Sequence, residues 1–89
     1  MDELLRLRRE IDRTDAELLE LFIYRMELCA SVGRYKKERG IAVFDQARES
    51  EIISRRAEKA GKWSDEAAAL WETLMSLSRK AQKGIIEED

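Results

Sequence analysis

Arg25 places a permanent positive charge within a heptad pattern that is otherwise almost wholly apolar. With Leu4 taken as position a, the a and d positions of this pattern are Leu4, Leu7, Ile11, Thr14, Leu18, Leu21, Arg25, Leu28, Val32 and Tyr35. A guanidinium among apolar side chains is unfavourable unless an anion meets it. The expected partner of Arg25 is therefore a carboxylate of the protein or an anionic ligand.

Two further cations on the same predicted helix bear on this choice. Lys36 lies eleven residues after Arg25, so the two side chains point in the same direction within about 20° and could share a small ligand. Arg8 lies seventeen residues before Arg25. That spacing is roughly 25 Å along the helix axis and about 100° around it, too far for both to reach one small molecule. If Arg8 belongs to a binding site, it serves the site of a partner chain.

Polar side chains also interrupt the apolar faces of two later helical segments, and function should be sought there. In the first of these, a single stripe at spacing i, i+3, i+4 and i+7 holds Asp45, Arg48, Glu49 and Ile52. In the second, one helical face holds Trp71, Met75, Ser78 and Gln82.

Each of these residues also has a purely structural explanation. An arginine at a single a position commonly fixes the register of a dimeric coiled coil, and for Arg25 alone that explanation is preferred. Arg48 and Glu49 could form a surface pair, and Ser78 could bond back to a helix carbonyl. The other cations would ordinarily be exposed. Taken singly, these residues do not establish a site.

The longest element expected to position these residues is a helix over about 2–39. Asp2 is a candidate N-cap, Gly40 follows the C-terminus, and Gly33 within the helix is expected to cost little. Such a helix is roughly 55 Å long, which exceeds the diameter of a globule of this size. The fifty residues that follow cannot cover its apolar face, so a second chain must cover part of it.

Two shorter helices are expected after this one. The second spans about 45–60 with Asp45 as its N-cap, and the third spans about 64–83 with Ser64 as its N-cap and Gly84 after its end. No strand is required, and we expect one domain over residues 1–89.

Composition supports an all-α fold and argues against several functions. The 89 residues include no proline and only four glycines, with 40% charged and 44% hydrophobic residues. A chain this short has a marginal core, which favours an oligomer. A net charge of −2 with interspersed signs provides no basic block for nucleic acid.

Cysteine and histidine usage gives further expectations. Cys29 is the only cysteine and histidine is absent, so one chain can build neither a disulfide framework nor the usual zinc site. Cys29 is expected to be a small buried apolar residue. With no signal peptide and no long apolar stretch, we expect a cytoplasmic protein that does not bind membranes.

Taken together, the polar residues match a known pattern in order and spacing. The segments that carry the match are Leu7-Arg8-Arg9-Glu10-Ile11-Asp12 with Asp15, Leu18-Leu19 with Arg25, Val32-Gly33 with Lys36, Asp45-Gln46-Ala47-Arg48-Glu49, and Ser78-Arg79-Lys80-Ala81-Gln82. In these segments the chain resembles the small all-helical chorismate mutases, over essentially its whole length. The resemblance implies an all-α fold with three helices per chain, one very long, in an intertwined antiparallel homodimer with two equivalent sites.

The activity that the resemblance implies is the conversion of chorismate to prephenate in the biosynthesis of phenylalanine and tyrosine. This reaction is a [3,3] Claisen rearrangement, in which an ether carbon–oxygen bond breaks as a carbon–carbon bond forms. It needs no proton transfer, covalent intermediate, metal or cofactor. The protein would hold the dianion in its compact reactive conformer and place donors where negative charge develops on the ether oxygen.

The resemblance also implies roles for the cations and their neighbours. Arg25 and the partner's Arg8 would bind the two carboxylates of the substrate, with Ser78 assisting. Lys36 and Gln82 would donate hydrogen bonds to the ether oxygen. An antiparallel pairing of the long helices would carry the partner's Arg8 toward Arg25, which accounts for the distance between these arginines within one chain.

The remaining implied residues surround the substrate ring. Asp45 and Glu49 would lie near the ring hydroxyl, and Arg48 would order these carboxylates. The apolar walls would be Val32, Ile52 and Met75.

Two alternatives to this function remain open. An isochorismate pyruvate-lyase resembles the same scaffold and binds a similar dianion, although Asp45 and Glu49 at the hydroxyl-binding positions favour the mutase. The other alternative is a non-catalytic helical dimerisation or regulatory module. A complete polar set argues against it, because a site without function should lose costly buried charges.

Overall fold

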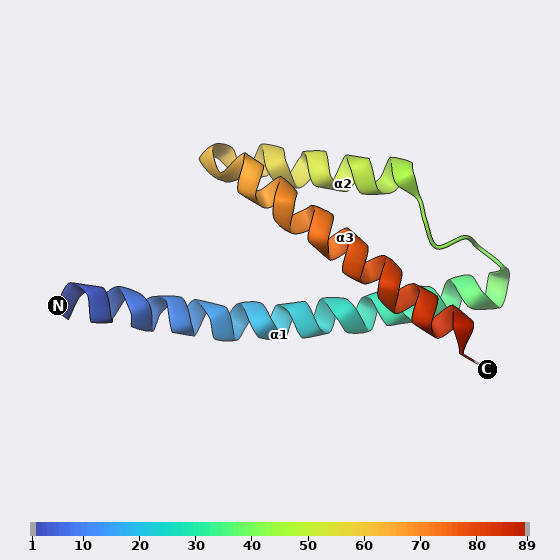
Figure 1. The fold of residues 1–89 in the computed structure, drawn as a ribbon, viewed down its shortest axis with the longest axis horizontal. Coiled ribbons are helices and arrows are strands. Elements are labelled where there is room, and N and C mark those ends of the chain that lie inside the picture. Colours follow the sequence, from blue (N-terminus) through green and yellow to red (C-terminus); the bar gives the residue numbers. More distant parts are fainter. Residues whose placement is uncertain (1, 89) are drawn as a thin grey trace.

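The computed structural model of the protein describes residues 2–88, and within this range the chain is all-α. The elements are α1 (Asp2–Arg39), α2 (Gln46–Lys59), a 3₁₀ turn η1 (Gly61–Trp63) and α3 (Ser64–Glu87). Helices α2 and α3 form a hairpin, and α3 crosses the C-terminal part of α1 (Figure 1). The N-terminal part of α1 extends away from both. The expected fold class, with three helices of which one is very long, is confirmed for the single chain.

The C-terminal end of α1 and the start of α2 follow the local signals in the sequence, whereas Asp2, the expected N-cap of α1, is already a helical residue in its first turn. Gly40 adopts a positive φ of 65° immediately after α1, where only glycine is unstrained. Asp45 is the N-cap of α2, because its Oδ1 accepts a hydrogen bond from the backbone N–H of Arg48 at 3.1 Å. Such a cap stabilises a helix by about 1 kcal/mol. It also fixes Asp45 at the end of the connector between the two helices, residues 40–45.

The start of α3 differs from the expectation that Ser64 is its N-cap. Ser64 has helical backbone angles of φ −60° and ψ −42°, so it already belongs to the helix. The reason is that η1 runs directly into α3, which moves the capping position to Trp63. Trp63 makes no side-chain capping bond there. The acidic residues Asp65 and Glu66 still occupy the first turn, where they complement the helix dipole.

The end of α3 also differs, because the helix does not stop before Gly84 but continues to Glu87. The expected end was therefore wrong, and a residue of α1 adds a hydrogen-bond donor at the observed end. Lys37 Nζ donates to the carbonyl of Ile85 at 3.1 Å and also to the carbonyl of Glu88. The carbonyl of Ile85 also accepts from the backbone N–H of Glu88 at 3.2 Å, and the ammonium group complements the helix dipole at this end.

Helices α1 and α3 approach each other closely at Gly33, which is buried. A Cβ atom on Gly33 would lie 3.0 Å from Gln82 Cα and 3.3 Å from Ile85 Cβ. Gly33 is therefore required by the close approach of the two helices, rather than being an incidental glycine in a long helix. Cys29, one turn earlier, is buried as expected.

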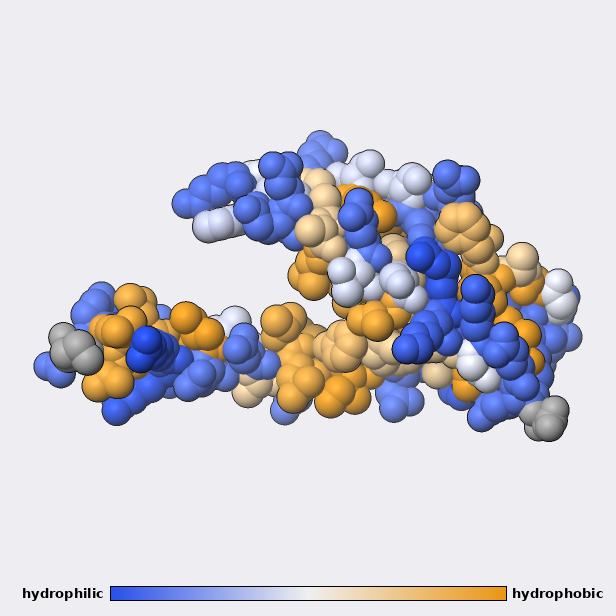
Figure 2. All heavy atoms as spheres, in the orientation of Figure 1, coloured by the Kyte–Doolittle hydropathy of each residue, from blue (hydrophilic) through white to orange (hydrophobic). Residues whose placement is uncertain are grey.

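The N-terminal half of α1 is not covered by the rest of the chain, since every residue over 2–21 is exposed. Hydrophobic side chains gather at the start and in the middle of α1, whereas the outer surface of α2 is hydrophilic (Figure 2). The accessible surface is 7294 Å², compared with roughly 5,400 Å² for a compact chain of this mass. The radius of gyration is 16.5 Å, compared with roughly 12 Å for a compact domain. The single chain is therefore far from compact.

None of the helices within residues 2–88 is long and apolar enough to cross a membrane.

Candidate active site

A cavity of about 380 Å³ lies between the C-terminal half of α1, the connector, the start of α2 and the C-terminal half of α3. Its lining consists of Arg25, Leu28, Cys29, Val32, Lys36, Val43, Asp45, Arg48, Glu49, Ile52, Met75, Ser78 and Gln82. Ten of the eleven residues singled out in the sequence are in this set, and Arg8 is the exception. The volume falls in the range of small-molecule sites.

Helix α1 contributes one continuous face to the cavity. Arg25, Cys29, Val32 and Lys36 follow the spacing i, i+4, i+7 and i+11, which places them in line along the helix. Arg25 Nη1 lies 3.6 Å from Cys29 Sγ, a weak acceptor. Among residues 2–88, no carboxylate forms an ion pair with Arg25, so most of its donors are available to a ligand.

Lys36 is held at the edge of the cavity by the connector. Its Nζ donates to the carbonyl of Val43 at 2.9 Å. An ammonium group has three hydrogens, so two remain for other acceptors. The bond also fixes the connector against α1, and Val43 itself contributes to the lining.

Helix α3 contributes a buried amide to the cavity. Gln82 is 6% exposed, and its Nε2 lies 3.0 Å from Ser78 Oγ. Its Oε1 is buried without a partner in the described part of the chain. A hydroxyl both donates and accepts, so Ser78 can bond to either end of this amide. One polar atom of Gln82 is left over in both orientations, and such an atom favours a ligand that completes its hydrogen bonding.

Helix α2 contributes two carboxylates. Asp45 caps the helix, while Glu49 in the first turn is partly buried and accepts a charge-assisted hydrogen bond from Arg79 Nη1 of α3. The family resemblance gives Arg48 the task of ordering these carboxylates. In the structure, the cation paired with Glu49 is Arg79, and the Arg48 side chain forms no ion pair within residues 2–88.

The charges of the lining favour an anionic ligand. The cavity lining has three cations and two carboxylates. One of the carboxylates, Glu49, forms an ion pair with Arg79, which lies outside the lining. The lining alone therefore has an excess of one positive charge. Since this charge lies in a partly enclosed space, it acts more strongly on a ligand than it would at an open surface.

Comparison with known proteins decides the family. The model of the family described as chorismate mutase type II matches residues 7–83. This chain belongs to the chorismate mutase type II family. The match includes every residue of the cavity lining and also Arg8.

Several curated relatives are consistent with this family. The T-protein of Haemophilus influenzae is 42% identical over 64 residues, which are 68% of this chain and 17% of that protein. The bifunctional chorismate mutase/prephenate dehydratase of Aquifex aeolicus is 38% identical over 55 residues, 62% of this chain and 15% of that protein. A 3-dehydroquinate dehydratase of Pyrobaculum aerophilum is 37% identical over 49 residues, 55% of this chain and 16% of that protein.

The chain therefore spans about a sixth of the length of these relatives. No solved structure shows a significant match to it.

Four residues of this chorismate mutase type II domain were not singled out in the sequence. Leu28 and Cys29 line the cavity beside Arg25, and their helical spacing to Val32 would have indicated them. Val43 lies in the connector, where no periodicity predicts which side chain points inward. Arg79 was part of a matching segment, but nothing local indicates that it pairs with a residue thirty positions earlier.

Arg8 is the one predicted site residue that the chain does not bring to the cavity. It lies on the exposed N-terminal half of α1, roughly 25 Å from Arg25 along the helix axis. The geometry agrees with the expectation that Arg8 cannot serve the site of its own chain.

Proposed function

We propose that this chain catalyses the rearrangement of chorismate to prephenate in aromatic amino acid biosynthesis, acting as a homodimer with two equivalent sites. The observation that carries the proposal is the cavity of the chorismate mutase type II domain. Residues from three helices and the connector converge there with an excess of cationic donors and a buried amide that lacks one partner.

Arg25 is the principal anion-binding group in this proposal. Its guanidinium has no competing carboxylate in the described part of the chain, so its forked donors suit a carboxylate of the substrate. Ser78 lies on the facing helix and assists. Binding both carboxylates at fixed positions holds the substrate in the compact conformer, which supplies part of the rate enhancement through positioning.

Lys36 and Gln82 donate to the ether oxygen. As the carbon–oxygen bond breaks, negative charge develops on that oxygen, and donors aimed at it stabilise the transition state more than the ground state. Lys36 has two hydrogens beyond its bond to Val43. When the Gln82 amide is turned so that its Oε1 accepts from the Ser78 hydroxyl, its Nε2 is free to donate to the ligand. Lys36 and Gln82 can then both donate to the ether oxygen without a movement of the backbone.

Asp45 and Glu49 lie near the ring hydroxyl, whose one hydrogen is donated to Glu49, while Val32, Ile52 and Met75 provide apolar walls. A partly buried carboxylate that accepts a hydrogen bond from a hydroxyl discriminates against a substrate lacking a hydroxyl at that place, because that hydrogen bond is then lost. Two carboxylates at one end of the cavity favour the mutase over an isochorismate pyruvate-lyase.

A second copy of the chain completes the site. Pairing two chains into a body as compact as its mass allows removes roughly 2,800 Å² of accessible surface from each, an amount typical of obligate homodimers. An apolar groove of about 510 Å³ is ready for this contact, with walls formed by Leu18 and Phe22 of α1 and by Leu70 and Leu74 of α3. Arg25 lines both this groove and the cavity. A chain seated in the groove therefore reaches the cavity at Arg25.

The partner's Arg8 is the second carboxylate-binding group. In a two-fold dimer, if residue 8 of one chain lies beside residue 25 of the other, the reciprocal contact follows. This condition places the two-fold axis about midway between residues 8 and 25 of α1, near residues 16 and 17. That position is at the edge of the apolar groove. Adding the partner's Arg8 raises the excess positive charge of the cavity lining from one to two, which strengthens the attraction for a dianion.

The test is to incubate the purified chain with chorismate and to follow both the loss of chorismate and the formation of prephenate. Arg25→Ala should lose about 100-fold or more in kcat/KM. The matched control is Arg34→Ala, on the same helix but exposed, with Ser31 as its side-chain partner among residues 2–88. Formation of pyruvate from isochorismate, with chorismate unchanged, would identify the lyase instead. If a folded dimer converts neither substrate, the remaining alternative is a non-catalytic helical dimerisation or regulatory module.

A further inference from the structure

Arg79 makes the only ion pair among residues 2–88 that joins two helices. The other pairs link residues within one helix, such as Glu3 with Arg6 or Glu51 with Arg55. Arg79 does not line the cavity, but its Nη1 donates to Oε1 of Glu49. Glu49 is part of the cavity lining. The side chains of Arg79 and Glu49 are 32% and 17% exposed. The pair is therefore partly shielded from water and stronger than an ordinary surface pair.

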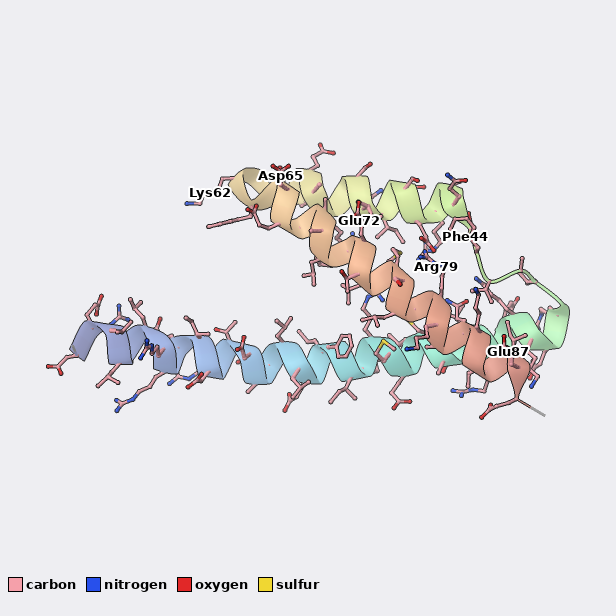
Figure 3. All side chains as sticks on the ribbon, viewed as in Figure 1. Phe44, Lys62, Asp65, Glu72, Arg79 and Glu87 are labelled. Atoms are coloured by element: carbon pink, nitrogen blue, oxygen red, sulfur yellow. The ribbon has the colours of Figure 1, made fainter. Side chains whose placement is uncertain are left out.

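Arg79 also contacts the connector. Its Cζ lies 5.4 Å from the centroid of the Phe44 ring, within the range of a cation–π interaction. Figure 3 shows Arg79 reaching from α3 toward the start of α2, with Phe44 beside it. The guanidinium thus contacts both Phe44, near the end of the connector, and Glu49, in the first turn of α2.

This position matters because α2 packs against α3 and makes no contact of its own with α1. The carboxylate of Glu49 must nevertheless face the same ligand as Arg25 and Lys36 of α1. The connector is held on the α1 side by the bond from Lys36 to Val43, and on the α3 side by Arg79. Removing the second attachment leaves the first turn of α2 without a charged link to α3.

We propose that Arg79 is a positioning residue for Glu49. It holds one carboxylate oxygen of Glu49 and leaves the other free to accept from the ligand, and it neutralises this carboxylate so that a dianion can bind beside it. Arg79 does not touch the substrate. The inference rests on the proposed function, because its readout is the turnover of chorismate.

Two effects follow from the loss of this cation. An unpaired Glu49 carboxylate would repel the substrate dianion, which raises KM. A mobile carboxylate would also meet the ring hydroxyl in fewer productive arrangements, which lowers kcat. Both effects require the Glu49 carboxylate that Arg79 holds, so they should disappear when Glu49 is replaced by glutamine. A purely structural role of Arg79 would persist in that background.

The experiment is a double-mutant cycle measured as kcat and KM for chorismate with Arg79→Met, Glu49→Gln and the double variant. Arg79→Met should lower kcat/KM by about 10-fold, and the double variant should match Glu49→Gln within about 2-fold. Arg79→Lys, which keeps the charge, should recover part of the loss. Lys80→Met is the matched control, since it removes a neighbouring exposed charge from the same helix and should retain wild-type kinetics.

The inference would be overturned if the fold-losses of kcat/KM in the two single variants multiplied in the double variant, that is, if their free energies were additive. It would also be overturned by equal kinetics for Arg79→Met and Lys80→Met. If Arg79→Met does not fold, Arg79→Gln provides the same cycle with a polar side chain of similar reach. A wild-type chain that leaves chorismate unchanged would refute the proposed function itself. An active wild type with an additive cycle would refute only the role of Arg79.

Discussion

The two halves of α1 are built from the same heptad pattern but have different surroundings. In the C-terminal half, Cys29 and Gly33 are buried against α3, and the polar side chains of that half converge on the cavity. In the N-terminal half, every residue over 2–21 is exposed, including apolar heptad residues such as Leu21, which is 65% exposed. The ionic contacts of this half stay within the helix, for example between Arg6 and Glu3.

The difference shows which part of the molecule is incomplete as a single chain. Arg6 lowers the pKa of Glu3 by a side-chain hydrogen bond, but both groups are fully exposed, so the pair does little to hold the helix. An isolated helix of this kind is marginal in water without tertiary packing. The C-terminal half packs against α3, whereas the N-terminal half is the part that a second chain would cover in the proposed dimer. Four predictions test this comparison.

The largest effect is expected from Leu21→Glu. In a monomer, this change at an exposed position would alter stability by less than about 0.5 kcal/mol. In the proposed dimer it buries an unpaired carboxylate at a cost of several kcal/mol, enough to abolish the folded dimer and its activity. The control is Ile23→Glu, which is also exposed but lies outside the groove lining. Light scattering and circular dichroism distinguish the two variants, and a folded, active Leu21→Glu protein would refute the proposed interface.

The second prediction tests whether the two halves serve different sites. Arg8→Ala and Arg25→Ala should each lose about 100-fold or more in kcat/KM. A heterodimer of the two has one site with both arginines and one with neither, so random exchange should restore about a quarter of the wild-type sites. The measurement is activity after subunit exchange verified by mass spectrometry of differently labelled chains. No recovery would place both arginines in the site of one chain.

The third prediction concerns Gln82, which lies where α3 crosses the C-terminal half of α1. Gln82→Glu keeps the shape of the side chain but donates only when protonated, so activity should be present below the pKa of the new carboxyl and lost above it. That pKa is ordinarily about 4.3; burial raises it and the neighbouring cations lower it. We expect a loss on the order of 100-fold near neutrality that recovers as pH falls.

The measurement is kcat/KM against pH for both proteins, over the range in which each stays folded by circular dichroism. A profile parallel to that of the wild type would remove Gln82 from the transition-state contacts.

The smallest effects are expected from two glycines. Gly33→Ala should destabilise the protein by about 1–3 kcal/mol, because its Cβ would lie 3.0 Å from Gln82 Cα and the helices would have to separate. Gly84→Ala meets no atom within 4 Å and should stabilise α3 by up to about 1 kcal/mol through helix propensity. Thermal midpoints at equal protein concentration measure both changes. Equal shifts would mean that the crossing is looser than the structure has it.

The sequence by itself determined the features that depend on near neighbours. Asp45 caps α2 and Gly40 ends α1, since capping and the left-handed backbone are decided within a few residues. Helical periodicity also predicted which polar residues share a face, and ten of the eleven candidates line one cavity. Their individual roles remain predictions.

Tertiary structure alone decided the features that depend on residues distant in sequence. Helix α3 passes through Gly84, and Lys37 of α1 supports its end by donating to the carbonyls of Ile85 and Glu88. Gly33 is required because α3 crosses there, and Glu49 pairs with Arg79 rather than with a cation on its own helix. A local pattern predicts which face a side chain occupies. It cannot predict which distant element will meet that face, because the partner is chosen by the packing of whole helices.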